Sequence, residues 1–428
     1  MNRGFYDTSM SLPDTPAPPR FLLGNTAHII HIDTEGGLCL LHPERLNTLS
    51  PIRFPFPGAI TNAVLLDENH LVATWVEREI SLARLAALDL REPIQEGVDL
   101  PELRVAIESG KINQHHVAGA SWSHILDAEP LALCVYENDI IFCTHHRGLY
   151  RVTSSSEEVW RRKPIEWDSL VELPDGEVIV ALFSKQESIW AFSLGGGWAE
   201  IDAADGTIRR RGVLQSKSSI NRVWGCDADE WLFGLSHNRM AKWFVDDESI
   251  QIKNVQGPIQ DAIWVDGKWL ITGWREDITW NRSDSKQVVP ELYCTTRAEI
   301  GHSIIDRGDE GFWVLNNRGQ WTPFGAKLNR WLESNRQRAP SSVIVTRRRT
   351  MGVLGRFMVG ITKCLPRFFV AGVARRYVAG KDISSTVSVM KKLSAEGACF
   401  TIDVLGEEIS NLEEAQFFID EYDRVLDA

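Results

Sequence analysis

The segment that decides the fold reads Asp261-Ala-Ile-Trp-Val-Asp-Gly-Lys-Trp-Leu-Ile-Thr-Gly-Trp274. Two apolar runs, rich in β-branched and aromatic residues, flank the dipeptide Asp266-Gly267. Such runs favour β-strands, and Asp-Gly is typical of a tight turn between them. The segment therefore predicts two short strands joined by a turn.

The same pattern of an apolar run, a small acidic or glycine turn and an aromatic-rich run recurs along residues 21–325. Clear copies are Ser169–Phe183, Arg222–Leu235 and Ser303–Leu315, and fainter ones begin near Ala27, Ile60 and Leu131. The copies start near residues 27, 60, 131, 168, 220, 259 and 302. The wider gap near 90–120 indicates an insertion.

Four-stranded units that repeat about every 40 residues are what a β-propeller requires, because each unit buries a face against the next and a ring leaves no end unit exposed. Seven copies predict about seven blades over 21–326, in a mainly β chain. The pattern resembles WD40-like and quinoprotein-like propellers in architecture only, because the Gly-His and Trp-Asp signature is absent. A stacked sandwich is the alternative, although it would not need a repeat.

Charge and tryptophan content divide the chain at the same place. Residues 1–326 carry 30 Lys/Arg and 46 Asp/Glu, residues 327–381 carry 13 and one, and residues 382–428 carry three and 11. All 16 tryptophans lie between Trp75 and Trp331. These shifts predict a polar, disordered N-terminus over 1–20, a propeller over 21–326 and a basic linker over 327–350. We expect most of the tryptophans to form the core between blades.

The sequence indicates a soluble cytoplasmic protein. Its seven cysteines are scattered and form no CxxC pair, which argues against a disulfide framework or a cysteine-based zinc site. The N-terminus lacks the apolar core of a signal peptide, and no uncharged apolar stretch reaches 18 residues.

Residues 351–428 change character from β-rich to α/β. Two helix-like basic segments are followed by an apolar helical stripe that ends at Gly397, then by a strand over 399–405. Ser410-Asn-Leu-Glu413 is a capping box that starts a last helix. We interpret this region as the first helices and first βα unit of a (β/α)8 barrel. One unit cannot cover both faces of its strand, so the chain is expected to stop where a catalytic domain begins.

Several spaced motifs in this region resemble the start of flavin-dependent proline dehydrogenases. They are Arg376-Tyr-Val-Ala-Gly380, Leu393-Ser-Ala-Glu-Gly397 and Thr401-Ile-Asp-Val-Leu-Gly-Glu407, and Lys381-Asp382 departs from the Glu-Thr usual in the family. The resemblance implies a barrel that holds FAD, oxidises L-proline to pyrroline-5-carboxylate and passes electrons to a quinone. It also implies that Asp403 is the acid beside the substrate pocket and Glu407 the acid that gates it.

Strand alternation is consistent with this assignment. Thr401, Asp403 and Leu405 share one face of the strand, which places Asp403 inside the barrel near the rim where barrel active sites lie. The alternative is that Asp403 is a hydrogen-bonded structural acid and Glu407 a solvated loop acid. Because flavin binding needs loops from around the whole barrel, we expect the 428-residue polypeptide alone to be colourless and inactive toward proline.

The remaining candidate sites are weaker. His115-His116 and His145-His146 lack the spacing of a metal motif, and on a strand such neighbours point to different faces, so no metal site is predicted. Leu194-Gly-Gly-Gly-Trp198 is a turn between strands rather than a phosphate loop. Arg209-Arg210-Arg211 indicates a solvated strand edge, and the acidic surroundings argue against nucleic-acid binding.

Residues 347–378 have one basic and one apolar side, which suits either peripheral contact with a membrane or packing on the barrel. Two functions follow from the sequence. The first is a propeller fused to the start of an FAD-dependent proline dehydrogenase. The second is a non-catalytic propeller that binds a protein partner and carries a vestigial barrel tail.

Overall fold

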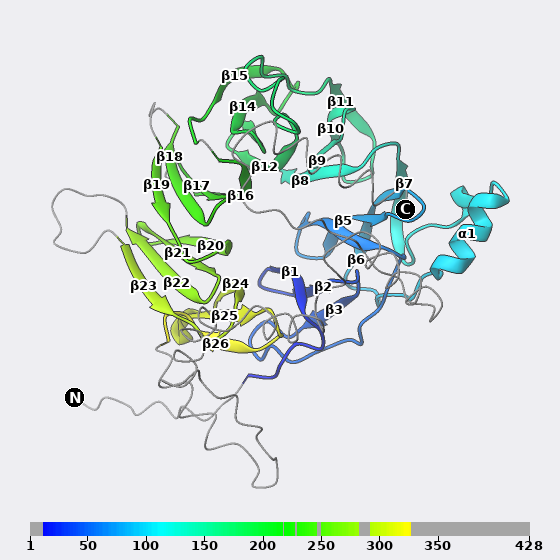
Figure 1. Cartoon of the computed structure of the whole chain (residues 1–428). Helices are drawn as coiled ribbons and strands as arrows, with labels where there is room; N and C mark the ends of the chain where they lie inside the picture. Colours follow the sequence, from blue (N-terminus) through cyan, green and yellow to red (C-terminus); the bar gives the residue numbers. More distant parts are fainter. Residues whose placement is uncertain (1–11, 217, 227–228, 246–249, 282–291, 327–428) are drawn as a thin grey trace, which may run out of the picture. The chain divides into compact units, whose positions relative to one another are not determined.

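The computed structural model describes residues 12–326, apart from 217, 227–228, 246–249 and 282–291. These residues form seven antiparallel sheets arranged in a ring (Figure 1). The predictions of a mainly β chain and of seven propeller blades are therefore confirmed. The predicted barrel start, 351–428, lies outside the described residues.

Each sheet is one blade, with its strands in sequence order from the innermost to the outermost. Blade 1 contains β1 (Pro19–Gly24), β2 (Ile29–Asp33) and β3 (Leu38–Leu41). Blade 2 contains β4 (Ala59–Leu65), β5 (His70–Glu77), β6 (Leu82–Asp89) and β7 (Ala120–Leu126). Blade 3 contains β8 (Pro130–Tyr136), β9 (Asp139–Thr144), β10 (Gly148–Val152) and β11 (Glu158–Arg162). Blade 4 contains β12 (Ile179–Lys185), β13 (Ser188–Ser193), β14 (Gly197–Asp202) and β15 (Ile208–Val213).

Blade 5 contains β16 (Ile220–Gly225), β17 (Glu230–Leu235), β18 (Arg239–Phe244) and β19 (Gln251–Asn254). Blade 6 contains β20 (Ile259–Val265), β21 (Lys268–Gly273), β22 (Glu276–Asn281) and β23 (Leu292–Thr296). Blade 7 contains β24 (Gly301–Asp306), β25 (Phe312–Asn316) and β26 (Trp321–Pro323). A short 3-10 turn, η2 (Gly308–Glu310), lies between β24 and β25.

The predicted turn at Asp266-Gly267 joins β20 to β21. Both residues have positive φ angles, 48° and 77°. A turn with two positive φ values matches the twist of the flanking strands, which explains why this copy of the repeat was the clearest.

The predicted insertion lies inside blade 2, between β6 and β7. It holds the helix α1 (Leu100–Glu108) and the 3-10 turn η1 (Ile112–Gln114). Asp99 caps α1 by accepting a hydrogen bond from the Glu102 N–H, and Pro101 occupies the first turn. Leu103 of the helix is fully buried in the blade 2 core, which holds the insertion against the sheet.

The ring closes where blade 7 meets blade 1. A hydrophobic cluster there contains Cys39 and Leu41 of β3 with Leu315 and Trp321 of blade 7, and Leu12 packs against it. The Thr15 N–H donates to the Gly319 carbonyl at 2.7 Å. The segment before β1 is thus bonded to the last blade, so the two ends of the propeller hold each other.

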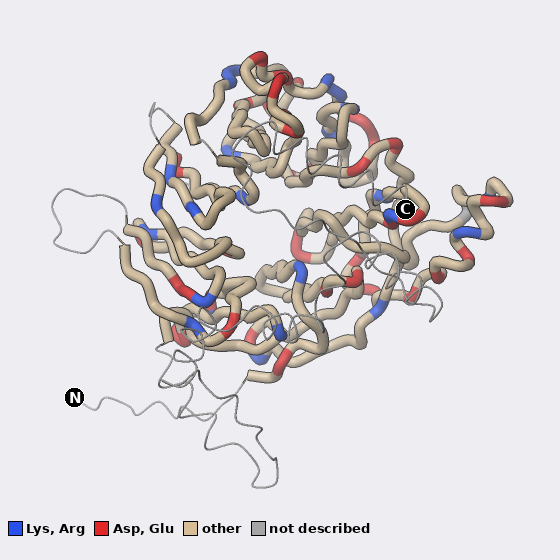
Figure 2. Tube along the Cα trace, in the orientation of Figure 1, with Lys and Arg blue, Asp and Glu red and all other residues tan. Residues whose placement is uncertain are grey.

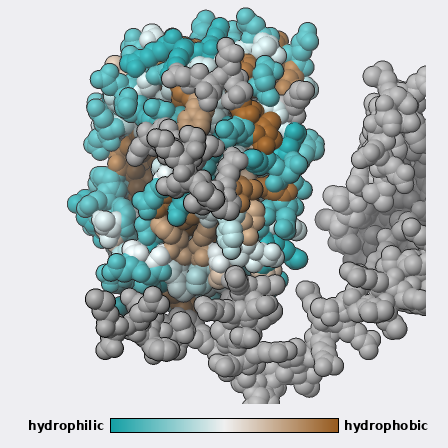
Figure 3. Space-filling view, turned by 90° about the vertical axis from the view of Figure 1, so that its left-hand side faces the viewer, coloured by the Kyte–Doolittle hydropathy of each residue, from teal (hydrophilic) through white to brown (hydrophobic). Residues whose placement is uncertain are grey.

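Most of the described tryptophans are buried in hydrophobic clusters shared by neighbouring blades, as the sequence predicted. Trp75, Trp231, Trp269 and Trp280 are among the largest fully buried side chains. On the outer side of blades 5 and 6, hydrophilic residues predominate and hydrophobic ones form scattered patches (Figure 3). Within the described residues, no helix is long and apolar enough to cross a membrane.

Candidate functional site

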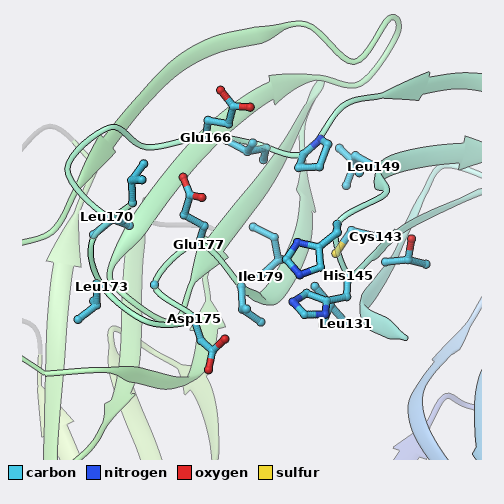
Figure 4. A pocket seen from close by; sticks show the side chains of 18 of the residues that line it. Leu131, Cys143, His145, Leu149, Glu166, Leu170, Leu173, Asp175, Glu177 and Ile179 are labelled. Carbon is cyan, nitrogen blue, oxygen red and sulfur yellow. The ribbon is translucent and has the colours of Figure 1, made fainter. Parts of the chain in front are cut away.

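A pocket of about 410 Å³ lies between blades 3 and 4 (Figure 4). Three parts of the chain line it. They are the start of β8 at Leu131, the turn between β9 and β10, and the long connection 164–178 that leads from β11 to β12. The pocket therefore belongs to the edge of the ring where innermost strands begin.

The connection 164–178 differs from the prediction, which placed a strand over its apolar residues. It is a series of turns in which the N–H groups of Leu170, Leu173 and Gly176 each donate to a carbonyl three residues earlier. Trp167 and Leu170 are buried in the core shared by blades 3 and 4. Val171 and Leu173 of the same apolar run are exposed instead, and blade 4 begins at Ile179 rather than near 168.

The turn between β9 and β10 depends on Gly148. Its φ is 106°, and a Cβ atom there would lie 2.0 Å from the Arg162 carbonyl oxygen. His145 and His146 belong to this turn, and their ring centroids are 3.7 Å apart. The expectation that the two rings point to opposite faces of a strand is wrong, because His146 has a φ of 59° in a turn.

The polar groups of the pocket suit a ligand that donates hydrogen bonds. The Thr144 hydroxyl is buried without a hydrogen-bond partner, whereas Glu177 accepts from the Trp167 N–H at 2.8 Å. Figure 4 shows Glu166, Glu177 and Asp175 on the side of the pocket that faces His145 and Cys143. No lysine or arginine lines the pocket. An apolar body with a positively charged or donor group would satisfy these walls.

Cys143 also lines the pocket, but it is no nucleophile. Burial raises the pKa of its thiol to about 12. Because the thiolate is the reactive form, a thiol with this pKa is inert near neutral pH. The pocket is consequently suited to binding rather than to covalent chemistry.

Asp403 and Glu407, the two acids singled out in the sequence, lie outside the described residues. His115 follows η1 and lies 4.0 Å from the Glu102 carboxylate. In the described part of the chain, no three histidines, cysteines or acids are placed to hold a metal ion.

The predicted solvated edge at Arg209–Arg211 is confirmed. These residues lie exposed on β15, where Arg209 pairs with Asp202 and Arg210 with Glu200. The glycine turn 195–197 joins β13 to β14. The Gly195 N–H donates to the Gly176 carbonyl, and the N–H groups of Gly196 and Gly197 donate to the carbonyl and the hydroxyl of Ser193. No N–H remains in that turn to hold a phosphate.

No family model matches the chain. Among curated proteins, proline dehydrogenase 1 of Bacillus subtilis (strain 168) is 42% identical over 55 residues. Its counterpart in Bacillus subtilis subsp. natto has the same identity over the same length. The match covers 13% of this chain and 18% of each relative, so the chain spans under a fifth of the length of these relatives.

Solved structures match the chain over a much larger share. The β-propeller domain of Cps50 (Swd1) from Myceliophteria thermophila has a TM-score of 0.50 and 10% identity, over 73% of this chain and 98% of that one. The computationally designed Ika8 protein has a TM-score of 0.47 and 9% identity, over 74% of this chain and 98% of that one. At 10% identity the likeness to Cps50 shows the fold alone, and the described chain is a seven-bladed β-propeller.

Proposed function

We propose that this chain joins a ligand-binding propeller to the opening segment of an FAD-dependent proline dehydrogenase. The observation that carries the proposal is the 42% identity to proline dehydrogenase 1 over 55 residues, together with the motif Thr401–Glu407. In this proposal 327–350 is a linker and 351–428 belongs to the barrel. The parent reaction is oxidation of L-proline to pyrroline-5-carboxylate, with electrons passed to a quinone.

Two features of the described residues do not fit FAD. The glycine turn 195–197 uses its N–H groups within the blade, and the pocket between blades 3 and 4 has acids but no lysine or arginine for a pyrophosphate. The roles proposed for this chain's own residues are that Asp403 lies beside the proline and that Glu407 gates its pocket.

A chimera tests this proposal. Residues 351–428 would replace the matching segment of Bacillus subtilis proline dehydrogenase 1. We expect the chimera to keep its flavin absorbance and to reduce a dye in the presence of proline. Asp403→Asn and Glu407→Gln should each lower kcat/KM at least about tenfold, since both remove a charge placed at the substrate pocket.

Glu408→Gln is the matched control, because Glu408 adjoins the motif but is not part of it. It should leave kcat/KM unchanged. A chimera without flavin, or equal losses in the Glu407 and Glu408 variants, would contradict the proposed barrel segment.

The pocket between blades 3 and 4 favours a second function, that of a non-catalytic binding protein. Its unpartnered Thr144 hydroxyl and its acidic, partly apolar walls fit a basic group on a partner. The double substitution Asp403→Asn and Glu407→Gln, introduced into the chromosomal gene, distinguishes the two functions. Unchanged growth on proline supports the binding protein, and loss of that growth supports the proline dehydrogenase.

The basic segment 347–378 carries a further proposal, that it contacts an anionic membrane. An amphipathic segment with arginines on one side is attracted to negatively charged lipid, and salt screens that attraction. A 347–378 peptide should sediment with anionic vesicles, not with neutral ones, and should be released at high salt. Equal sedimentation with both lipids would rule out the contact.

A further inference from the structure

The innermost strand of every blade has a register shift near its start, at the second residue in six blades and at the third in β4. In β16, for example, the pairing with β17 skips from Ile220 to Arg222. The shift recurs in all seven blades. Such a β-bulge frees one residue from the ladder and re-aims its side chain. The seven residues so placed are Arg20, Thr61, Leu131, Val180, Asn221, Gln260 and His302.

These seven residues, here called the axial ring, surround one end of the innermost strands. All seven are partly or fully exposed, whereas the residue before each of them is buried. Water therefore reaches this level of the ring. Leu131 also lines the pocket between blades 3 and 4, so that pocket lies beside the axial ring.

Two arginines at this level have no acidic partner. Arg20 is in the axial ring, and Arg222 follows the ring residue Asn221. Within the described chain, neither guanidinium lies within 4.0 Å of a carboxylate. Arg222 donates through Nη1 to the Gln260 carbonyl, and Arg20 makes no hydrogen bond to protein. The Arg20 Nε atom is buried and unpartnered, and its guanidinium lies over the Phe21 ring, 5.7 Å from the centroid.

Arg222 lies within the electrostatic field of Arg20. Burial lowers the pKa of Arg222, Asp261 raises it, and the positive charge of Arg20 lowers it further. Burial and the charge of Arg78 lower the pKa of Arg20. Guanidinium groups nevertheless stay protonated in proteins, so two like charges are held near each other. Figure 2 shows basic residues on the innermost strands β1 and β16.

The nearest acid, Asp261, offsets only one of the two positive charges. The Asp261 carboxylate, whose pKa burial raises to about 6, accepts hydrogen bonds from the N–H groups of Ala262, Ile304 and the Trp224 indole. These hydrogen bonds link blades 5, 6 and 7. Positive charge remains in excess at the axial ring near neutral pH.

His302 adds a neutral hydrogen-bonding group. Burial, with the charges of Arg222 and His31, lowers the pKa of its imidazole to about 4. Its Nδ1 lies 2.7 Å from the Ser303 hydroxyl. Among the described residues its Nε2 has no partner. The neutral imidazole can therefore donate a hydrogen bond through an Nε2–H without adding charge to the axial ring.

We propose that Arg20 and Arg222 bind the oxyanion group of a small ligand, a carboxylate or a phosphate, with His302 as a neutral donor. Guanidinium forks match the geometry of such groups, and charge-assisted hydrogen bonds are the strong ones in proteins. An anion between the two arginines would also relieve their mutual repulsion. The inference is independent of the proline dehydrogenase segment.

Calorimetric titration of the full chain tests the site, with inorganic phosphate and malonate as probes and sodium chloride at equal ionic strength as the blank. We expect saturable binding of one probe or both, and the tighter probe identifies the group as phosphate or carboxylate. Arg20→Gln and Arg222→Gln should each weaken binding about tenfold, the usual value of a charge-assisted hydrogen bond. Arg45→Gln, which removes an exposed arginine elsewhere in blade 1, should change nothing.

A melting curve without added anion separates binding from a structural role. Arg20→Gln should melt at or above the wild-type temperature at low salt, because its guanidinium is repelled by Arg78 and its buried Nε has no hydrogen-bond partner. Absence of saturable binding of both probes, unchanged affinity in both axial variants, or an equal loss in Arg45→Gln would overturn the proposal.

Discussion

Replacing Asp277 by alanine should lower the free energy of unfolding of the propeller by about 3–5 kcal/mol. The Asp277 side chain is 1% exposed, and its Oδ2 lies 2.7 Å from Nη1 of Arg297, which is 6% exposed. Removing one member of a buried ion pair leaves the other as an uncompensated charge, which costs far more than the pair contributes. Urea unfolding followed by circular dichroism measures the loss.

This pair also holds the last blade. Asp277 lies on β22 of blade 6 and accepts from the Gly325 N–H beyond β26 at 2.8 Å, while Arg297 donates to the Thr322 hydroxyl on β26. Because blade 7 closes the ring against blade 1, we expect the contact between these two blades to open first in the variant. Faster proteolysis near β26 than within blades 2–5 is the expected local sign.

Two variants control this prediction. Asp127→Ala removes an exposed acid that lies 3.4 Å from Arg147, and it should cost less than about 1 kcal/mol because water screens such pairs. The double variant Asp277→Ala/Arg297→Met removes both buried charges and should be more stable than Asp277→Ala alone. A double variant less stable than the single one would show that the pair is not the cause.

The sequence predicted the blades because each copy carries turn chemistry that the strand pairing needs. Asp266-Gly267 fixes the β20–β21 turn, and five of the seven predicted starts fall within one residue of the start of an innermost strand, at β4, β8, β16, β20 and β24. The copy near 27 begins at β2 instead, because β1 and the bonded segment before it lack the repeat pattern.

The pocket and the axial ring could not be predicted in the same way. Leu170 was assigned to a strand because a buried turn and a strand leave the same apolar signature in a short run. The prediction of which side chains face the core depends on strict alternation along a strand, and a β-bulge interrupts that alternation. The sequence therefore did not indicate that Arg222 and His302 lie in a site. Alignment of the copies on their first strands would have found the column that contains Asn221, Gln260 and His302.

The prediction of the propeller and the prediction of the C-terminal acids rest on different kinds of sequence evidence. A repeat can be checked against itself, whereas Asp403 and Glu407 depended on a resemblance that covers a small share of the chain. Their roles stay predictions, which the chimera tests. The axial arginines depend only on the described blades, so their test stands apart from the barrel segment.

The Trp231→Ala variant should lose about 3–5 kcal/mol of unfolding free energy, as large aromatic truncations in cores do. Trp231 lies on β17 of blade 5 with 1% of its surface exposed. Its ring centroid is 4.7 Å from that of Phe192, 5.2 Å from Phe183 and 5.5 Å from Trp190, all on blade 4. The truncation therefore opens a cavity between two blades rather than within one.

The Trp231→Phe variant distinguishes the contribution of ring packing from that of the indole N–H. The Trp231 Nε1 is buried without a hydrogen-bond partner, so phenylalanine loses ring volume but also removes an unsatisfied N–H, which offsets part of the cost. We expect this variant to lose clearly less than Trp231→Ala. Trp274→Ala is the matched control, because Trp274 is 43% exposed and its removal leaves no closed cavity. If Trp274→Ala destabilises the chain as much as Trp231→Ala, the contact between blades 4 and 5 does not carry the stability assigned to it.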